Sequence, residues 1–340
     1  MKTIKTLALT CAIAVGLVSC SDNDNNDSVI QNEAKVLFTS NNADGNVNIY
    51  NVTNINSVMK STLETSATAA DGIYYDGSED LIVQASRSTL GLEGYAGVSI
   101  ASSAINATVT ANIMSGLNMS SPREVAVNGD FYVVADNADA DGIDITKDGR
   151  LFIYTKSGSN FTLRNIITTD IKLWGITFIG NDLYAVADTT NELAVYSNFL
   201  NNTSTTTLTA SKQIAIEGIV RTHGLTYDSM TDTMILTDIG DAGSGTDGGF
   251  HVIENFNSKF NSTANGATLA VNQQTRVAGS NTVLGNPVDV AYDGSTKTVY
   301  IAEAKNGKIL AFNNINTGGN ITPVYSADLA AASAVYFYKE

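Results

Sequence analysis

One acidic segment of this sequence has the residue spacing of a metal-binding loop. It runs from Asn137 to Asp148 and reads Asn-Ala-Asp-Ala-Asp-Gly-Ile-Asp-Ile-Thr-Lys-Asp. Side-chain oxygens at Asn137, Asp139 and Asp141, a glycine directly after them and a carboxylate at Asp148 match the way a calcium loop wraps a hard cation. Asn137 replaces the usual first aspartate, and Asp148 is shorter than the usual bidentate glutamate. The segment is therefore either a calcium site or a solvated acidic hairpin loop.

A second acidic pattern recurs at the ends of short apolar runs. The acids are Asp136, Asp188, Asp238 and Glu303, and Ser40 and Ser86 hold the equivalent place in two further runs. Aspartate at such a place readily accepts hydrogen bonds from nearby backbone N–H groups. We therefore expect these acids to support turns rather than to bind a ligand.

The overall composition excludes several classes of function. The formal net charge is −15 and the sequence pI is about 4.4, so the surface repels nucleic-acid phosphate and anionic lipid headgroups. Two histidines, His223 and His251, without any cysteine after Cys20 argue against a zinc site with nitrogen and sulfur ligands. The mature chain has no Gly-x-Ser-x-Gly elbow, phosphate-binding loop or dinucleotide fingerprint.

The N-terminal residues indicate export. Lysines precede a short apolar run that ends in Leu-Val-Ser-Cys at Cys20, and this run is too short to span a bilayer. The pattern resembles a bacterial lipoprotein signal, which implies cleavage of residues 1–19 and lipid attachment at Cys20; an ordinary secretory signal is the alternative. Residues 20–34 form an acidic tether, similar to the segment that sends Bacteroidetes lipoproteins to the cell surface. We expect an outer-membrane lipoprotein that faces the exterior and contacts the membrane through its anchor.

A repeated phrase determines the predicted fold of residues 35–340. An apolar strand recurs at intervals of 45 to 65 residues, and second and third apolar strands follow most copies. The copies of the first strand are 72–76, 124–128, 175–179, 224–228, 289–293 and 334–338. Four short strands per unit of about 50 residues, separated by Asn, Asp and Gly turns, are typical of a β-propeller blade.

Strands from the two ends of the chain are predicted to belong to one blade. The last copy, at 334–338, has no strand after it, whereas 36–40 and 47–50 match second and third strands without a first strand before them. We therefore predict an all-β protein, a six-bladed β-propeller whose last blade is closed by the N- and C-terminal strands. The weaker fourth strands are predicted at 107–113, 161–167 and 321–325.

Two of the predicted blades resemble a known repeat. Residues 185–196, Ala-Val-Ala-Asp-Thr-Thr-Asn-Glu-Leu-Ala-Val-Tyr, and residues 301–312, with Glu303 in place of the aspartate, are similar to the NHL repeat. The resemblance implies a six-bladed propeller that binds partners. The related gluconolactonase-like propellers hydrolyse lactones with a metal in the central channel.

The propeller geometry places one residue of each blade at the mouth of the central channel. These residues are Asp71, Arg123, Trp174, His223, Val288 and Ser333. Glu124 and Asp289 stand where three other blades have glycine, in blades on opposite sides of the ring. Aromatic, cationic and acidic side chains at one mouth indicate a pocket for a small molecule or glycan.

Other interpretations of the mouth remain open. Trp174 packs between blades and Arg123 pairs with a nearby acid if the mouth is purely structural. A metal held by Glu124, Asp289 and His223 is what the lactonase resemblance would imply. The sequence thus favours a lipid-anchored envelope protein that binds a glycan, protein or small molecule. A metal-dependent lactonase-type hydrolase and a structural platform of an envelope complex are the alternatives.

Overall fold

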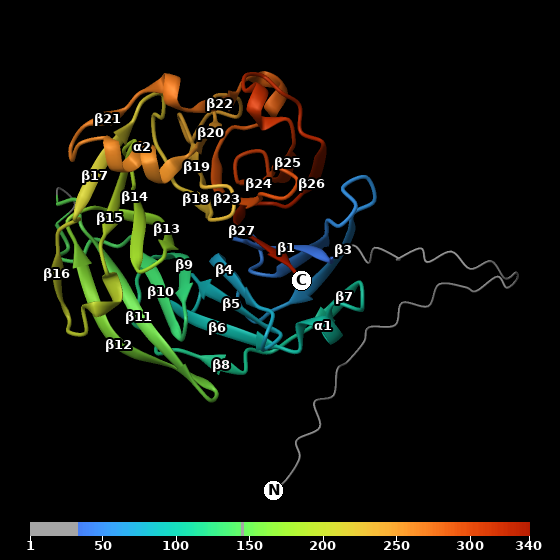
Figure 1. The fold of residues 1–340 in the computed structure, drawn as a ribbon. Helices are drawn as coiled ribbons and strands as arrows, with labels where there is room; N and C mark the ends of the chain where they lie inside the picture. The colour runs from blue at the N-terminus through green and yellow to red at the C-terminus, as the bar shows by residue number, and fades with distance from the viewer. Residues whose placement is uncertain (1–32, 144–145) are drawn as a thin grey trace, which may run out of the picture. The chain divides into compact units, whose positions relative to one another are not determined.

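The structure is a computed structural model that describes residues 33–143 and 146–340. The predicted signal, Cys20 and the predicted tether up to residue 32 lie outside the described residues. The described chain is built from short antiparallel strands that form six four-stranded units, joined by turns rich in Asn, Asp and Gly (Figure 1). The prediction of an all-β propeller is confirmed.

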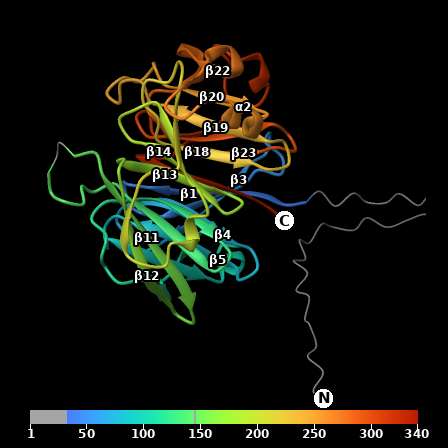
Figure 2. The same ribbon diagram turned by 60° about the vertical axis from the view of Figure 1, so that its left-hand side comes forward.

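Three of the units contain the first half of the chain. The first unit pairs β27 (Ala332–Lys339), β1 (Lys35–Asn41), β2 (Val47–Asn51) and β3 (Met59–Glu64). The second contains β4 (Ala70–Asp76), β5 (Leu81–Ser86), β6 (Gly91–Ala96) and β8 (Ile113–Met114), and the third contains β9 (Pro122–Asn128), β10 (Phe131–Asp136), β11 (Gly149–Ser157) and β12 (Asn160–Thr169). The β11–β12 hairpin, with the longest strands, extends beyond its neighbours (Figure 2).

The other three units follow in chain order. The fourth contains β13 (Leu173–Ile179), β14 (Asp182–Ala187), β15 (Glu192–Tyr196) and β17 (Lys212–Ile216). The fifth contains β18 (Leu225–Asp228), β19 (Thr233–Asp238), β20 (Gly249–Glu254) and β22 (Thr275–Ala278), and the sixth contains β23 (Pro287–Asp293), β24 (Thr298–Glu303), β25 (Lys308–Phe312) and β26 (Tyr325–Asp328).

The first strands of the six units lie around a common centre. In Figure 1, β4, β9, β13, β18, β23 and β27 are innermost, and each contacts the next in that order until β27 contacts β4. β27 also pairs with β1 in register from Lys35 opposite Lys339 onward, so the terminal strands share a sheet as predicted. This pairing leaves no open edge at the junction between the ends of the described chain.

Several outer strand edges carry a short additional strand. β7 (Asn106–Thr108), β16 (Thr206–Leu208) and β21 (Thr268–Leu269) pair in parallel with β3, β12 and β17, and β8 bridges to β12. These pairings satisfy backbone groups that an outer strand would otherwise expose. The second and third units thereby become one continuous sheet.

The fourth strands are where the sequence prediction was least accurate. The segment predicted as one strand at 107–113 divides into β7, which pairs with the preceding unit, and the two-residue β8. The strand predicted at 321–325 begins only at Tyr325. Outer strands have few apolar neighbours, so their sequences carry little of the alternation that marks the inner strands.

Helices are short and peripheral. They are α1 (Val98–Ala101), α2 (Phe256–Ser262) and the 3₁₀ turns η1 (Phe199–Asn201), η2 (Val271–Gln273), η3 (Ser280–Thr282) and η4 (Ile315–Thr317). In the described part of the chain, no helix has the length and apolar character needed to cross a membrane. α2 occupies the long interval of the fifth unit and packs Phe256 and Phe260 against the core.

The inner strands lie between the hydrophobic clusters and the channel. In β9, for example, Val125 packs in a hydrophobic cluster with residues of the second unit, and the neighbouring Glu124 lines the channel. Glycine lets the inner strands approach closely at the channel mouth. A Cβ atom on Gly175 would lie 2.4 Å from the carbonyl oxygen of His223, and one on Gly72 would lie 2.6 Å from that of Arg123. The repeated glycine therefore positions the residues that precede each inner strand.

Candidate functional site

The candidate site is one mouth of the channel, where the loops after the second strands meet the segments that lead into the inner strands. Three side chains from three consecutive units form a stack there. The guanidinium carbon of Arg123 lies 3.9 Å from the centroid of the Trp174 ring, and His223 stacks on Trp174 with ring centroids 3.5 Å apart and an angle of 7° between planes. A cation over indole is the strongest form of cation–π contact. The stack fixes all three side chains.

Asp71 anchors the arginine end of the stack. Its carboxylate accepts a hydrogen bond of 3.0 Å from Arg123 Nη1 and one of 2.6 Å from Asn42 Nδ2, and the Nε atom of Arg87 lies 3.7 Å away. Burial raises the pKa of Asp71 in spite of the two guanidinium groups. Burial also lowers the pKa of Arg123, and Asp71 opposes that shift. The desolvation of this pair thus outweighs its Coulombic attraction.

Asp188 anchors the histidine end. Oδ1 lies 3.0 Å from His223 Nε2 and accepts a hydrogen bond from Arg221, while Oδ2 accepts one from Asn137. Burial alone would raise the pKa of Asp188, but the hydrogen bond from His223 and the charges around it hold that pKa well below its usual range. Burial lowers the pKa of His223 to about 4, although Asp188 opposes this shift.

These pKa shifts define the tautomer of His223. At neutral pH the imidazole is uncharged and Asp188 is ionised, so Nε2 carries the proton that Asp188 accepts. Nδ1 is then an acceptor, and it is buried without a partner among the residues that the structure describes. Buried polar atoms without partners also occur at Arg123 Nε, Asn42 Oδ1 and Thr222 Oγ1. The mouth therefore combines preorganised groups with donors and acceptors that the described protein atoms leave unsatisfied.

The channel below the mouth is a cavity of about 300 Å³ lined by the six inner strands. Glu124 and Asp289 line it from opposite units. Burial and repulsion from Asp289 raise the pKa of Glu124 well above its usual range. Burial raises the pKa of Asp289 to about 7, although the N–H groups of Val335 and Val290 donate to its carboxylate. These two carboxyl groups hold protons at a pH at which ordinary carboxylates are ionised.

The carboxyl groups in the channel do not form a three-ligand metal centre with His223. Among residues 33–143 and 146–340, the one group of three acidic or histidine side chains whose ligand atoms lie within 4.8 Å of one another is Asp139, Asp141 and Asp148. His223 instead directs Nε2 at Asp188. The arrangement suggested by the lactonase resemblance is thus not assembled at the mouth.

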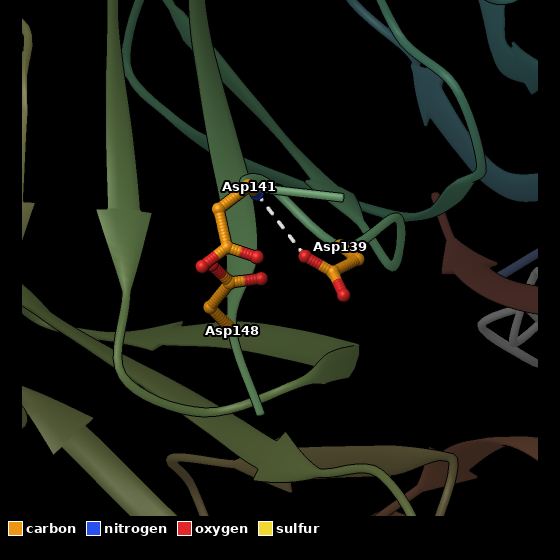
Figure 3. A group of neighbouring side chains, drawn as sticks. All are labelled: Asp139, Asp141 and Asp148. Carbon is orange, nitrogen blue, oxygen red and sulfur yellow. Dashed lines mark hydrogen bonds between the residues drawn. The ribbon is translucent and has the colours of Figure 1, made fainter. Parts of the chain in front are cut away.

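The three aspartates of the predicted calcium loop lie together, as Figure 3 shows. Asp139 Oδ1 accepts hydrogen bonds from the N–H groups of Asp141 and Gly142, and Asp148 Oδ1 accepts one from Ala140. The second oxygen of Asp139 is buried and has no hydrogen-bond partner among residues 33–143 and 146–340. The amide nitrogen of Asn137 points elsewhere, because it donates to Leu173 and Asp188. Asp139, Asp141 and Asp148 therefore make up the carboxylate part of the candidate cation site.

The recurring acids divide into two groups. Asp136, Asp238 and Glu303 each accept hydrogen bonds from N–H groups just before the first strand of their own unit, such as Ser120 and Ser121 for Asp136. This is the turn-supporting role expected for them. Asp188, which belongs to the same pattern, instead faces the mouth and holds His223 and Arg221.

The structure brings four of the six residues predicted for the mouth into one cluster, and loop residues complete that cluster. Asp71, Arg123, Trp174 and His223 form one connected cluster, and Ser333 donates to the carbonyl of Ala70 at the same level. The residues that the sequence argument left out are Asn42, Arg87, Asn137, Asp188 and Arg221. Asn42, Arg87, Asn137 and Asp188 lie directly after second strands, and Arg221 precedes β18 by several residues. Asp188 belongs to the recurring acidic pattern, but that pattern was interpreted as turn support rather than as part of the mouth.

Comparison with known proteins supports the fold and nothing finer. No family model matches the sequence, and no curated protein does. A chain in a crystal structure of a nidogen/laminin complex is similar, with 12% identity, a TM-score of 0.59 and coverage of 89% of this chain and 98% of that one. A putative 6-phosphogluconolactonase of Bacteroides fragilis has 10% identity, a TM-score of 0.58 and coverage of 92% and 100%. One of Bacteroides uniformis has 10% identity, a TM-score of 0.56 and coverage of 91% and 100%. At such identities the likeness concerns the fold alone.

Proposed function

We propose that this protein is a lipid-anchored binding protein of the cell envelope that takes a small polar ligand, such as part of a glycan, at the channel mouth. The observation that carries the proposal is the stack of Arg123, Trp174 and His223, because it holds unpartnered buried atoms at both ends. A site that leaves a donor and an acceptor unsatisfied gains free energy when a ligand supplies both.

Trp174 makes the proposal directly testable. It is the single tryptophan of the chain, so its intrinsic fluorescence reports on this mouth without labelling. The full-length protein would be titrated with a panel of soluble mono- and oligosaccharides. We expect at least one to change the emission of Trp174 saturably and to lose affinity in a His223→Ala variant. A panel that leaves the emission and the melting temperature unchanged would contradict the proposal.

Membrane attachment rests on the sequence around Cys20. Labelled palmitate should enter the wild-type protein and not a Cys20→Ala variant, and only the wild type should sediment with the outer membrane. Protease treatment of intact cells tests exposure, because a surface protein is degraded and an inward-facing one survives. A fixed partner that co-purifies from solubilised membranes would favour the alternative role of a structural platform.

We also propose that the loop of Asp139, Asp141 and Asp148 binds calcium. Three carboxylates lie within reach of one ion, and one of them has a buried oxygen without a partner in the described part of the chain; such a group fits a hard cation. Millimolar calcium should raise the melting temperature of the wild type and leave Asp148→Asn unaffected, because asparagine keeps the acceptor for Ala140 but removes the charge. Equal responses of the two proteins, or no heat in calorimetry, would remove the claim.

A lactonase-type hydrolase is the second candidate. The fold likeness to putative 6-phosphogluconolactonases and the protonated carboxyl groups of Glu124 and Asp289 favour it. A general acid needs a pKa near the working pH, and burial provides that for Asp289. Lactone hydrolysis that is lost in Glu124→Gln, with unchanged binding at the mouth, would support this candidate over simple binding.

A further inference from the structure

Arginine is distributed unevenly over this acidic protein. The chain has six arginines, and five of them pair with buried aspartates on the mouth side of the units. Arg87, Arg123 and Arg221 belong to the mouth itself. The sixth, Arg164, donates instead to the backbone carbonyls of Leu200 and Asn202.

The charges at the mouth do not balance. Three guanidinium groups face two mouth aspartates, Asp71 and Asp188. The other nearby acids, Glu124 and Asp289, have raised pKa values and so contribute less negative charge at neutral pH. In a chain with a formal net charge of −15, this leaves a local excess of positive charge around the channel opening.

The arginines also keep hydrogen-bonding capacity. Arg87 lies 3.7 Å from Asp71, beyond hydrogen-bond distance, and 33% of its side chain is exposed. Arg221 uses Nε and Nη2 on Asp188, and 29% of its side chain is exposed. A guanidinium group has five N–H donors, so both retain donors that point to solvent or ligand. Buried aspartates hold these groups in place and thus lower the entropy lost on binding.

We propose that the mouth selects an anionic ligand, a small hydroxylated molecule with a carboxylate or phosphate group, which Arg221 binds beside the stack of Arg123, Trp174 and His223. The anion accepts hydrogen bonds from the N–H groups of Arg221 that Asp188 does not use. The inference rests on the proposed function, because it names the ligand class of that same site. It differs from that function in requiring charge selectivity.

The test compares three sugars of similar size: D-glucuronate, D-glucose 6-phosphate and D-glucose. Each is titrated into the full-length protein at fixed ionic strength, and Trp174 emission gives the dissociation constant. We expect at least one of the two anions to bind at least tenfold more tightly than glucose. Tighter binding of glucuronate identifies a carboxylate ligand, and tighter binding of glucose 6-phosphate identifies a phosphate ligand. Equal affinities for all three sugars, or no response to either anion, would overturn the inference.

Variants distinguish a specific arginine contact from a general effect of positive charge near the mouth. Arg221→Gln should weaken binding of the anion about tenfold or more and leave binding of glucose unchanged, and Arg221→Lys should restore part of the affinity. Lys305→Gln is the matched control, because it removes one positive charge from an exposed loop on the same side of the sheets. A loss in Lys305→Gln as large as in the arginine variants would contradict the site. A neutral sugar that binds as well as the anions refutes this inference while leaving the proposed function intact.

Discussion

The imidazole of His223 lies flat on the indole of Trp174, with ring centroids 3.5 Å apart and planes that differ by 7°. The contact joins two consecutive units, because Trp174 lies in β13 and His223 lies just before β18. It also couples the protonation of a buried histidine to the only tryptophan of the chain. The electrostatic state of the mouth therefore has an optical signal.

Acid should quench the fluorescence of Trp174 with a midpoint near pH 4. Burial lowers the pKa of His223 to about 4, and a protonated imidazole in contact with indole quenches its emission. The unfolded chain takes up this proton near pH 6.5, so the free energy of unfolding should fall by about 3 kcal/mol as the pH drops from 6.5 to 4. His223→Gln should abolish the quenching step. A midpoint near 6.5 in the folded protein would show that the imidazole is not buried as described.

The ion pair of Asp71 and Arg123 should show strong coupling in a double-mutant cycle. Arg123→Gln alone leaves a buried carboxylate with one distant guanidinium and should cost about 3 to 5 kcal/mol of unfolding free energy. Because burial raises the pKa of Asp71 in spite of its partners, the pair itself adds little net stability. The double variant with Asp71→Asn should therefore lose much less than the sum of the single variants.

A solvent-exposed ion pair provides the control for that cycle. Lys297 and Glu254 lie 3.3 Å apart with half of each side chain exposed. Their coupling, measured by the same urea unfolding experiments, should stay below about 1 kcal/mol. Similar coupling energies for the two pairs would mean that Asp71 and Arg123 are more solvated than the structure indicates.

Glu124→Gln should stabilise the protein at alkaline pH. Burial raises the pKa of Glu124 and that of Asp289, so the folded state holds protons that the unfolded state releases above about pH 4. The free energy of unfolding of the wild type should consequently decline as the pH rises through 7. Glutamine keeps the acceptor for Val125 and has no proton to lose, so the variant should gain about 1 to 3 kcal/mol over the wild type at pH 9.

Comparing Glu124→Gln with the wild type at pH 5 shows whether the gain in stability depends on ionisation. The gain of the variant should be smaller there than at pH 9, because the unfolded wild type begins to release its proton only above about pH 4. Asp130→Asn, in an exposed turn, should match the wild type at both pH values. A gain in Glu124→Gln that is equal at pH 5 and pH 9 would point to packing rather than ionisation.

The sequence predicted the inner part of the molecule better than its outer part. The inner strands show regular alternation and a repeated small residue. From these patterns we predicted the pairing of β27 with β1, and we assigned Asp71, Arg123, Trp174 and His223 to one mouth, where they are in contact. Loop residues do not show this alternation or a repeated small residue. Asn137, which has calcium-loop spacing, donates to Asp188 in the neighbouring unit, and no local pattern predicts a contact of that kind.

Gly175→Ala should disrupt both the ring and the mouth. The N–H group of Gly175 donates to the carbonyl of His223 at 2.9 Å, and an added Cβ atom would lie 2.4 Å from that same oxygen. β13 and the segment before β18 must then separate, which should cost about 2 to 3 kcal/mol and change the emission of Trp174 as its contact with His223 loosens. Gly158→Ala is the control: it has a φ of +58° and open space around it, so it should cost about 1 kcal/mol without any optical change. Equal costs for the two substitutions, measured by urea unfolding, would show that close approach of the inner strands does not position the mouth.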